Sequence, residues 1–124
     1  MGGAGVTACG GGGVDVYDGG DGIDTLISGM ISGSWYGDYI DEINLETGTA
    51  GGKGSDFNRD TLKNIENVTY VGVLNTEITG DGKNNVLIGS TAEDILNGGS
   101  GNDTLKGGAG IDKLIGGSGD DIID

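Results

Sequence analysis

The feature that most constrains this chain is a nine-residue period that runs without interruption from residue 80 to residue 124. The five units read GDGKNNVLI, GSTAEDILN, GGSGNDTLK, GGAGIDKLI and GGSGDDIID. Glycine fills positions 1, 2 and 4 of the last three units, position 6 is Asp or Asn, and position 8 is Leu or Ile. A short fixed period is typical of solenoids, in which each unit packs only on its neighbours. The period therefore determines the architecture before any single residue is considered.

A shorter array of the same kind lies near the other end of the chain. Residues 10–18 (GGGGVDVYD) and 19–27 (GGDGIDTLI) match the pattern at every fixed position. The intervening segment is not periodic, although GGKGSD at 51–56 repeats the loop half of the unit once. We expect one continuous solenoid domain with three parts: N-terminal repeats at 1–27, a spacer at 28–79 and C-terminal repeats at 80–124.

The unit predicts an all-β fold. Its glycines let the backbone turn sharply with positive φ. The last three residues form a minimal strand whose single apolar side chain, at position 8, points inward and stacks on its equivalent one coil away. In the spacer, Tyr39, Asp41, Ile43 and Leu45 alternate and precede the turn residues 46–48, which predicts a further strand at 39–45. No segment has a helical period.

Composition restricts the class of partner. Twenty acidic residues against six basic ones give a net charge of −14, which disfavours nucleic acid and favours cations. The absence of His removes Ser–His triads and most zinc sites. The sequence shows neither a signal peptide nor an apolar run of membrane-spanning length. We therefore expect no membrane insertion, and export would depend on another route or on a part of the protein outside this sequence.

The loop half of the unit suits a hard cation. A sharp glycine turn leaves main-chain carbonyls pointing inward, and Asp at position 6 adds a carboxylate. Calcium takes six to eight oxygen ligands and tolerates irregular geometry better than magnesium does. The alternative is a set of solvated turn residues that cap their own backbones, but this does not account for their recurrence beside fixed glycines. We expect several Ca²⁺ ions.

The unit resembles the repeat-in-toxin (RTX, haemolysin-type) nonapeptide GGxGxDxUx. The resemblance is close at 10–27 and 80–124 and partial at 51–56, and the segment NLETGTA…DTL…IENV is similar to spacers between such arrays in large secreted bacterial proteins. It implies a parallel β-roll in which two units form one coil. It also implies a non-catalytic module, secreted or on the bacterial cell surface, that leaves through a type I secretion channel and folds on calcium outside the cell.

The resemblance further implies that calcium lies between loops two repeats apart. Its ligands come from positions 2, 4 and 6 of one loop and positions 1, 3 and 6 of the other. The three sites are Gly99, Gly101 and Asp103 with Gly116, Ser118 and Asp121; Ser90, Ala92 and Asp94 with Gly107, Ala109 and Asp112; and Asp81, Lys83 and Asn85 with Gly98, Ser100 and Asp103. We expect the third to be the weakest, because Asn85 replaces a carboxylate and Lys83 adds positive charge.

The N-terminal loops leave alternatives open. Their equivalent residues are Gly11, Gly13 and Asp15 in one loop and Gly20, Gly22 and Asp24 in the next. The segment two repeats after the first loop, 28–33, has no acid at position 6. Asp15 and Asp24 then find partners in the spacer, in a second chain, or in repeats outside this sequence. The spacer candidates are Asp38, Asp56 and Asp60.

The sequence is also compatible with two other functions. Loops 107–112 and 116–121 have no later partner in this sequence, so head-to-tail stacking of chains would give calcium-dependent oligomers or filaments. Trp35, Tyr36 and Tyr39 either stack on a glycan, in an accessory module of a polysaccharide-modifying enzyme such as an alginate epimerase, or cap the core. Asp60 and Glu66 are a formal acid/base pair, but turns account for so many acids that we expect no catalysis.

Overall fold

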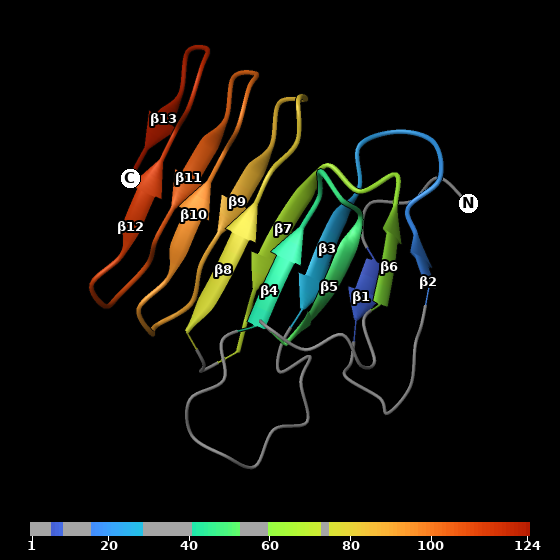
Figure 1. The fold of residues 1–124 in the computed structure, drawn as a ribbon, viewed down its shortest axis with the longest axis horizontal. Coiled ribbons are helices and arrows are strands. Elements are labelled where there is room, and N and C mark those ends of the chain that lie inside the picture. The colour runs from blue at the N-terminus through green and yellow to red at the C-terminus, as the bar shows by residue number, and fades with distance from the viewer. Residues whose placement is uncertain (1–5, 9–15, 29–40, 53–59, 73–74) are drawn as a thin grey trace.

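The computed structural model describes residues 6–8, 16–28, 41–52, 60–72 and 75–124 (Figure 1). Within these residues the only regular elements are strands, so the all-β class is confirmed. The strands are β1 (Val6–Ala8), β2 (Val16–Asp18), β3 (Thr25–Ser28), β4 (Asp41–Asn44), β5 (Thr49–Gly52), β6 (Asp60–Lys63), β7 (Asn67–Tyr70), β8 (Thr76–Thr79), β9 (Val86–Ile88), β10 (Ile95–Asn97), β11 (Thr104–Lys106), β12 (Lys113–Ile115) and β13 (Ile122–Ile123).

The strands form two sheets, and successive C-terminal units alternate between them. Sheet A has the order β1-β3-β7-β9-β11-β13 and is parallel throughout, whereas sheet B has the order β12-β10-β8-β4-β5-β6-β2. Each strand of the C-terminal array pairs with the strand two units away, so that Leu87 aligns with Leu105 and Leu96 with Leu114. Two nonapeptides thus make one coil, and the predicted parallel β-roll is confirmed.

The core between the sheets is a ladder of position 8 side chains. Leu87, Leu96 and Leu105 are fully buried, because a three-residue strand directs only its central side chain inward. Burying each such side chain contributes about 1.5–3 kcal/mol. The ladder extends into the rest of the chain through Leu26 and Val68 in sheet A and Ile43 and Ile78 in sheet B, and Leu114 packs against it.

The spacer contributes more strands to sheet B than to sheet A. β4 and β6 flank β5 in antiparallel pairs, while β4 joins β8 and β6 joins β2 in parallel. Between β3 and β7, sheet B therefore holds three strands where strict alternation would place one, whereas in sheet A β3 pairs directly with β7. The strand predicted at 39–45 appears as β4, and the turn after it closes with a positive φ at Gly48.

Several predicted features fall elsewhere. Gly51 and Gly52, expected to begin an isolated loop, lie in β5. Other predicted features lie outside the described residues. They are the remainder of that loop with Asp56, the N-terminal ligands Gly11, Gly13 and Asp15, the residue Asp38, and the aromatic residues Trp35, Tyr36 and Tyr39.

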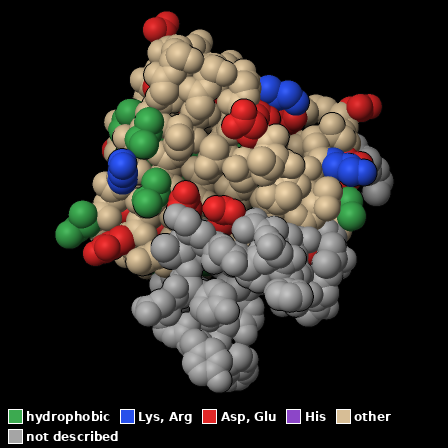
Figure 2. All heavy atoms as spheres, viewed as in Figure 1, with side chains coloured by type: hydrophobic (Ala, Val, Ile, Leu, Met, Phe, Trp, Pro, Cys, Tyr) green, Lys and Arg blue, Asp and Glu red, His purple; other side chains and the backbone are tan. Residues whose placement is uncertain are grey.

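The surface reflects the composition. In Figure 2 much of the visible face is backbone and small polar side chains, with scattered acids and only small groups of hydrophobic side chains. No helix in the part that the structure describes is long and apolar enough to cross a membrane.

Candidate metal-binding loops

The loops that join the two sheets form two stacked columns, one at each end of the strands (Figure 1). One stack, here the first column, contains loops 19–24, 64–66, 80–85, 98–103 and 116–121. The second column contains loops 89–94 and 107–112. Neighbouring loops of the C-terminal array are 18 residues apart along the chain because each coil consists of two units. Each pair of loops for which a shared site was expected is therefore adjacent in space.

Position 6 links each loop to its neighbour. The backbone N–H of Asp103 donates to Oδ1 of Asp121 (2.8 Å), and that of Asp94 donates to Oδ1 of Asp112 (2.9 Å). The N–H of Asn85 donates in the same way to Oδ1 of Asp103 (2.8 Å). One oxygen of each carboxylate thus holds the preceding loop in place, while its Oδ2 remains near the glycine at position 1 of its own loop.

The glycines are required for two different reasons. Those at positions 2 and 4 of the full-pattern loops that the structure describes have φ between 82° and 109°, which other residues rarely adopt. The glycine at position 1 is needed for space, because a Cβ on Gly98 would lie 2.5 Å from Oδ2 of Asp103 and 2.8 Å from the Gly116 carbonyl oxygen. The backbone of each loop is therefore closely packed around its own acid.

Main-chain carbonyls of one loop face the next. A Cβ on Gly101 would lie 2.6 Å from the carbonyl oxygen of Lys83, and a Cβ on Gly99 would lie 2.9 Å from that of Asp81. The carbonyls of Gly99 and Gly101 similarly face Gly117 and Gly119 of loop 116–121. Carbonyl oxygens of positions 2 and 4 thus point into the gap between loops that the carboxylates also border.

Asp103 has a buried carboxylate whose charge is only partly compensated. Its side chain is buried, and Oδ2 has no hydrogen-bond partner among the described residues. Burial raises the pKa of Asp103, and the nearby charges of Asp121 and Asp81 raise it further, against the lowering effect of the Asn85 N–H. A buried carboxylate oxygen without a donor is costly. A bound cation would remove that cost, so these residues fit one.

The types of oxygen ligand that these loops offer favour calcium. In the described part of the chain, no three acidic, His or Cys side chains converge on one point as a cluster of metal ligands. A cation here would be held by a mixture of carboxylate and main-chain carbonyl oxygens, which suits a hard ion of flexible coordination such as Ca²⁺.

Loop 89–94 satisfies its acid internally. The Ser90 N–H donates to Oδ2 of Asp94 (2.6 Å), and the Ser90 hydroxyl contacts the same oxygen (3.2 Å). Burial raises the pKa of Asp94, while the hydrogen bonds from Ser90 and Thr76 lower it in part. Positions 2 and 4 of this loop are Ser90 and Ala92, and neither has a positive φ. The loop is therefore closed differently from the full-pattern loops.

Loop 80–85 is closed by a pair of side chains. The Asp81 N–H donates to Oδ1 of Asn85 (2.9 Å), and Nδ2 of Asn85 donates to Oδ1 of Asp81 (3.1 Å). That Asp81 oxygen also accepts from the Lys83 N–H (2.9 Å). The amide of Asn85 therefore supplies a donor that the carboxylate of the repeat pattern lacks.

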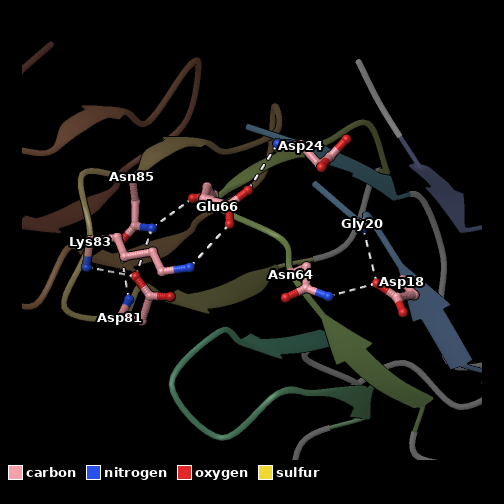
Figure 3. Close-up of polar contacts among 8 residues, drawn as sticks. All are labelled: Asp18, Gly20, Asp24, Asn64, Glu66, Asp81, Lys83 and Asn85. Atoms are coloured by element: carbon pink, nitrogen blue, oxygen red, sulfur yellow. Dashed lines mark hydrogen bonds and ion pairs between the residues drawn. The ribbon is translucent and has the colours of Figure 1, made fainter. Parts of the chain in front are cut away.

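Loop 19–24 meets the spacer at Glu66, which was not among the partners expected for Asp24. The buried Asp24 donates its N–H to Oε2 of Glu66 (2.9 Å; Figure 3). The Asp24 carbonyl accepts from the N–H groups of Glu66 and Asn67. Of the expected partners that the structure describes, Asp60 lies in β6. Glu66 precedes β7 as a position 6 acid precedes its strand, so aligning Val68 with Leu26 at position 8 would have identified it.

Hydrogen bonds to Asp18 also stabilise this junction. Nδ2 of Asn64 donates to Oδ1 of Asp18 (2.8 Å), and this bond, followed by that from the Gly20 N–H, lowers the pKa of Asp18 (Figure 3). Asn64 takes a φ of 55°, the only positive value at a non-glycine residue in the described segments. Loop 64–66 is therefore a short turn that occupies the place of a full loop.

A family model describing the RTX calcium-binding nonapeptide repeat matches the chain in four copies, at residues 10–29, 72–105, 79–114 and 98–124. Together these matches cover more than half of the sequence. A search of curated proteins gave no match. The matched segments contain both arrays and all the full-pattern loops described above. The chain therefore belongs to the RTX calcium-binding nonapeptide repeat family.

Proposed function

We propose that this chain is a non-catalytic calcium-binding module of a secreted bacterial protein, and that the ions it binds outside the cell drive its folding. The observation that carries the proposal is Asp103, whose buried Oδ2 has no donor within the described structure and borders a gap lined by carbonyls. Such an arrangement is costly without a cation and stable with one.

The best-supported site lies between loops 98–103 and 116–121. Its ligands would be Gly99, Gly101 and Asp103 with Gly116, Ser118 and Asp121. The two loops are already aligned by the Asp103–Asp121 bond and by the Ser118 N–H, which donates to the Gly99 carbonyl (3.0 Å). Both loops have positive φ at positions 2 and 4. The ion would therefore bind to a largely preorganised pair of loops.

The other two sites rank lower on the same criteria. The site of Ser90, Ala92 and Asp94 with Gly107, Ala109 and Asp112 has one carboxylate already satisfied by Ser90. The site of Asp81, Lys83 and Asn85 with Gly98, Ser100 and Asp103 has an amide in place of one carboxylate, and that amide is engaged by Asp81. We expect calcium to fill the sites in this order of decreasing affinity.

Folding and location are linked through the charge. With a net charge of −14, the compact chain repels itself until cations bind. Extracellular sites typically have Kd values of about 10⁻⁴–10⁻³ M. An ion at ten times its Kd stabilises the folded state by about 1.4 kcal/mol. Low cytosolic calcium would leave the C-terminal coils unfolded for export through a type I channel, and higher external calcium would then fold them.

A calcium titration of three proteins tests the proposal. Isothermal calorimetry on the wild type should detect several ions, and circular dichroism should show β structure increasing with them. Asp103→Asn should weaken binding at least about tenfold at the two sites that share this residue. Asp120→Asn, an exposed acid of the neighbouring loop, is the matched control and should bind as the wild type does. A chain that takes up no calcium, or that is equally β-rich in excess chelator, would refute the proposal.

The Asp103 variant has a second signature. Without calcium, Asp103→Asn removes a buried negative charge but retains the Oδ1 that accepts from Asn85. Its unfolding free energy in chelator should therefore equal or exceed that of the wild type, whereas in calcium it should be lower. A decrease of equal size under both conditions would mean that Asp103 has only a structural role.

A further inference from the structure

The junction between the spacer and the C-terminal repeats has an arrangement of charge that no later junction shares. Glu66 lies in the first column between loop 19–24 and loop 80–85, as the order β3-β7-β9 in sheet A requires. Its Oε2 accepts from the N–H of Asp24, the position 6 residue of the preceding loop. Glu66 therefore makes the contact that Asp103 and Asp121 make in the later coils.

The other oxygen of Glu66 has a positively charged partner within the chain. Nζ of Lys83 lies 3.2 Å from Oε1 of Glu66 (Figure 3). The Glu66 side chain is only 10% exposed, so its charge needs compensation, while the Lys83 side chain is 63% exposed and reaches inward from solvent. Lys83 stands at position 4, where the repeat pattern has glycine. Because Lys83 replaces that glycine, its ammonium group lies beside Glu66, which corresponds to the position 6 acid in the preceding layer.

Asn85 completes the junction. Its Nδ2 donates to the Glu66 carbonyl (2.6 Å) and to Oδ1 of Asp81 (3.1 Å). An aspartate at this position would place a carboxylate against a carbonyl oxygen and a second carboxylate, which is unfavourable unless a cation intervenes. The two departures from the pattern, Lys83 and Asn85, therefore supply a positive charge and a hydrogen-bond donor at the same layer.

We propose that Lys83 and Asn85 replace a calcium ion at this layer, so that the junction of loops 19–24, 64–66 and 80–85 forms without metal. The proposal rests on the proposed function, since it assigns the calcium requirement to the later layers. The metal-independent junction then gives the C-terminal coils a folded template on which to stack when calcium arrives.

Hydrogen exchange in excess chelator tests this, read by mass spectrometry at amides on each side of the boundary. In the wild type, the amides of Asp24, Glu66 and Asn67, whose acceptors lie in the junction, should be protected. The amides of Asp103, Ser118 and Ile122, whose acceptors lie in the later layers, should gain protection only when calcium is added. Equal exchange of both groups in chelator would overturn the proposal.

Four variants identify the residues responsible. In chelator, Lys83→Met should reduce protection at the junction about three- to fivefold, the size expected of a partly exposed ion pair. Lys83→Arg should preserve protection, and Lys106→Met, an exposed lysine of β11, should leave it unchanged. Asn85→Asp should reduce protection in chelator and recover it in calcium, because it restores a carboxylate that needs a cation. An effect of Lys83→Met no larger than that of Lys106→Met would refute the role of Lys83.

These measurements distinguish a failure of this inference from a failure of the proposed function on which it rests. If calcium protects no amide anywhere, the proposed function fails, while the Lys83→Met comparison in chelator still tests the ion pair. If calcium protects the later layers but the junction also requires it, the function stands and the inference fails.

Discussion

Loops 80–85 and 98–103 occupy consecutive places in one column of the roll, yet the side chain at position 6 is satisfied in opposite ways. In the first loop, Asn85 exchanges hydrogen bonds with Asp81 and donates to Glu66. In the second, Asp103 keeps a buried oxygen with no donor among the described residues. Two loops at equivalent places in the column can therefore be closed by side chains or left open for a metal, and the residues at positions 2, 4 and 6 determine which occurs.

The largest effect on this comparison should come from the glycines. Gly101→Ala forces a side chain onto a φ of 101° and places its Cβ 2.6 Å from the Lys83 carbonyl oxygen. We expect it to cost about 1–3 kcal/mol of unfolding free energy in calcium, measured by urea denaturation. Gly82→Ala is the matched control, since Gly82 has no positive φ and its Cβ would meet only Ser100 Oγ at 3.5 Å. Equal losses in the two variants would show that neither the positive φ nor the nearby carbonyl oxygen makes Gly101 harder to replace than Gly82.

A smaller effect should come from the loop that satisfies itself with a hydroxyl. Ser90→Ala removes the hydroxyl bonds to Asp94 and the bond from the Ala92 N–H, and should cost about 1 kcal/mol in chelator. Because Asp94 is then less satisfied, calorimetry should detect tighter calcium binding at the second site. Ser118→Ala, which retains the backbone bond to Gly99, should change neither quantity much. Unchanged or weaker binding in Ser90→Ala would contradict the idea that Ser90 competes with the ion.

The smallest effect is the dependence on pH, which should have opposite signs with and without metal. Burial raises the pKa of Asp94 and Asp103 in the metal-free fold, so the folded chain binds protons more tightly than the unfolded chain does. This proton-linked stability is present below the unfolded pKa of about 3.9 and is lost as the pH rises through the raised pKa values. In saturating calcium the charged carboxylates are stabilised, so stability should instead rise with pH over the same window.

Denaturation midpoints measured from pH 4 to pH 7, in metal-free buffer and in calcium, test this. Asp103→Asn should flatten both profiles. Profiles that rise together under the two conditions would indicate that burial does not govern these carboxylates.

The repeats made most of the roll predictable from sequence. A nine-residue period determines where each strand falls, which side chain points inward and which loops become neighbours, because all three follow from local repetition. Leu87, Leu96 and Leu105 are therefore buried in the core, as their place at position 8 predicts. The ligand sets implied by the family resemblance lie on adjacent loops, and the hydrogen bonds between Asp103 and Asp121 and between Asp94 and Asp112 join them.

The spacer was less predictable because its contacts are long-range and not periodic. Nothing in the local sequence indicates that β5 runs antiparallel between β4 and β6. Asp24 and Glu66 are 42 residues apart, so their pairing depends on how the spacer folds back. From the sequence, the positive charge of Lys83 predicts only a weaker third calcium site, whereas its ammonium group lies against Glu66.

The position 6 hydrogen bonds between loops have a consequence for how sharply the molecule responds to calcium. In the calcium-driven folding proposed above, each acid would order the loop before it, so that an ion bound in one coil would improve the geometry of the next. Neighbouring sites would then form a one-dimensional array with nearest-neighbour coupling. In such an array the steepness of the transition increases with the number of coupled coils. The number of coils would therefore set the width of the calcium range over which the chain folds, and the composition of individual loops would set where that range lies.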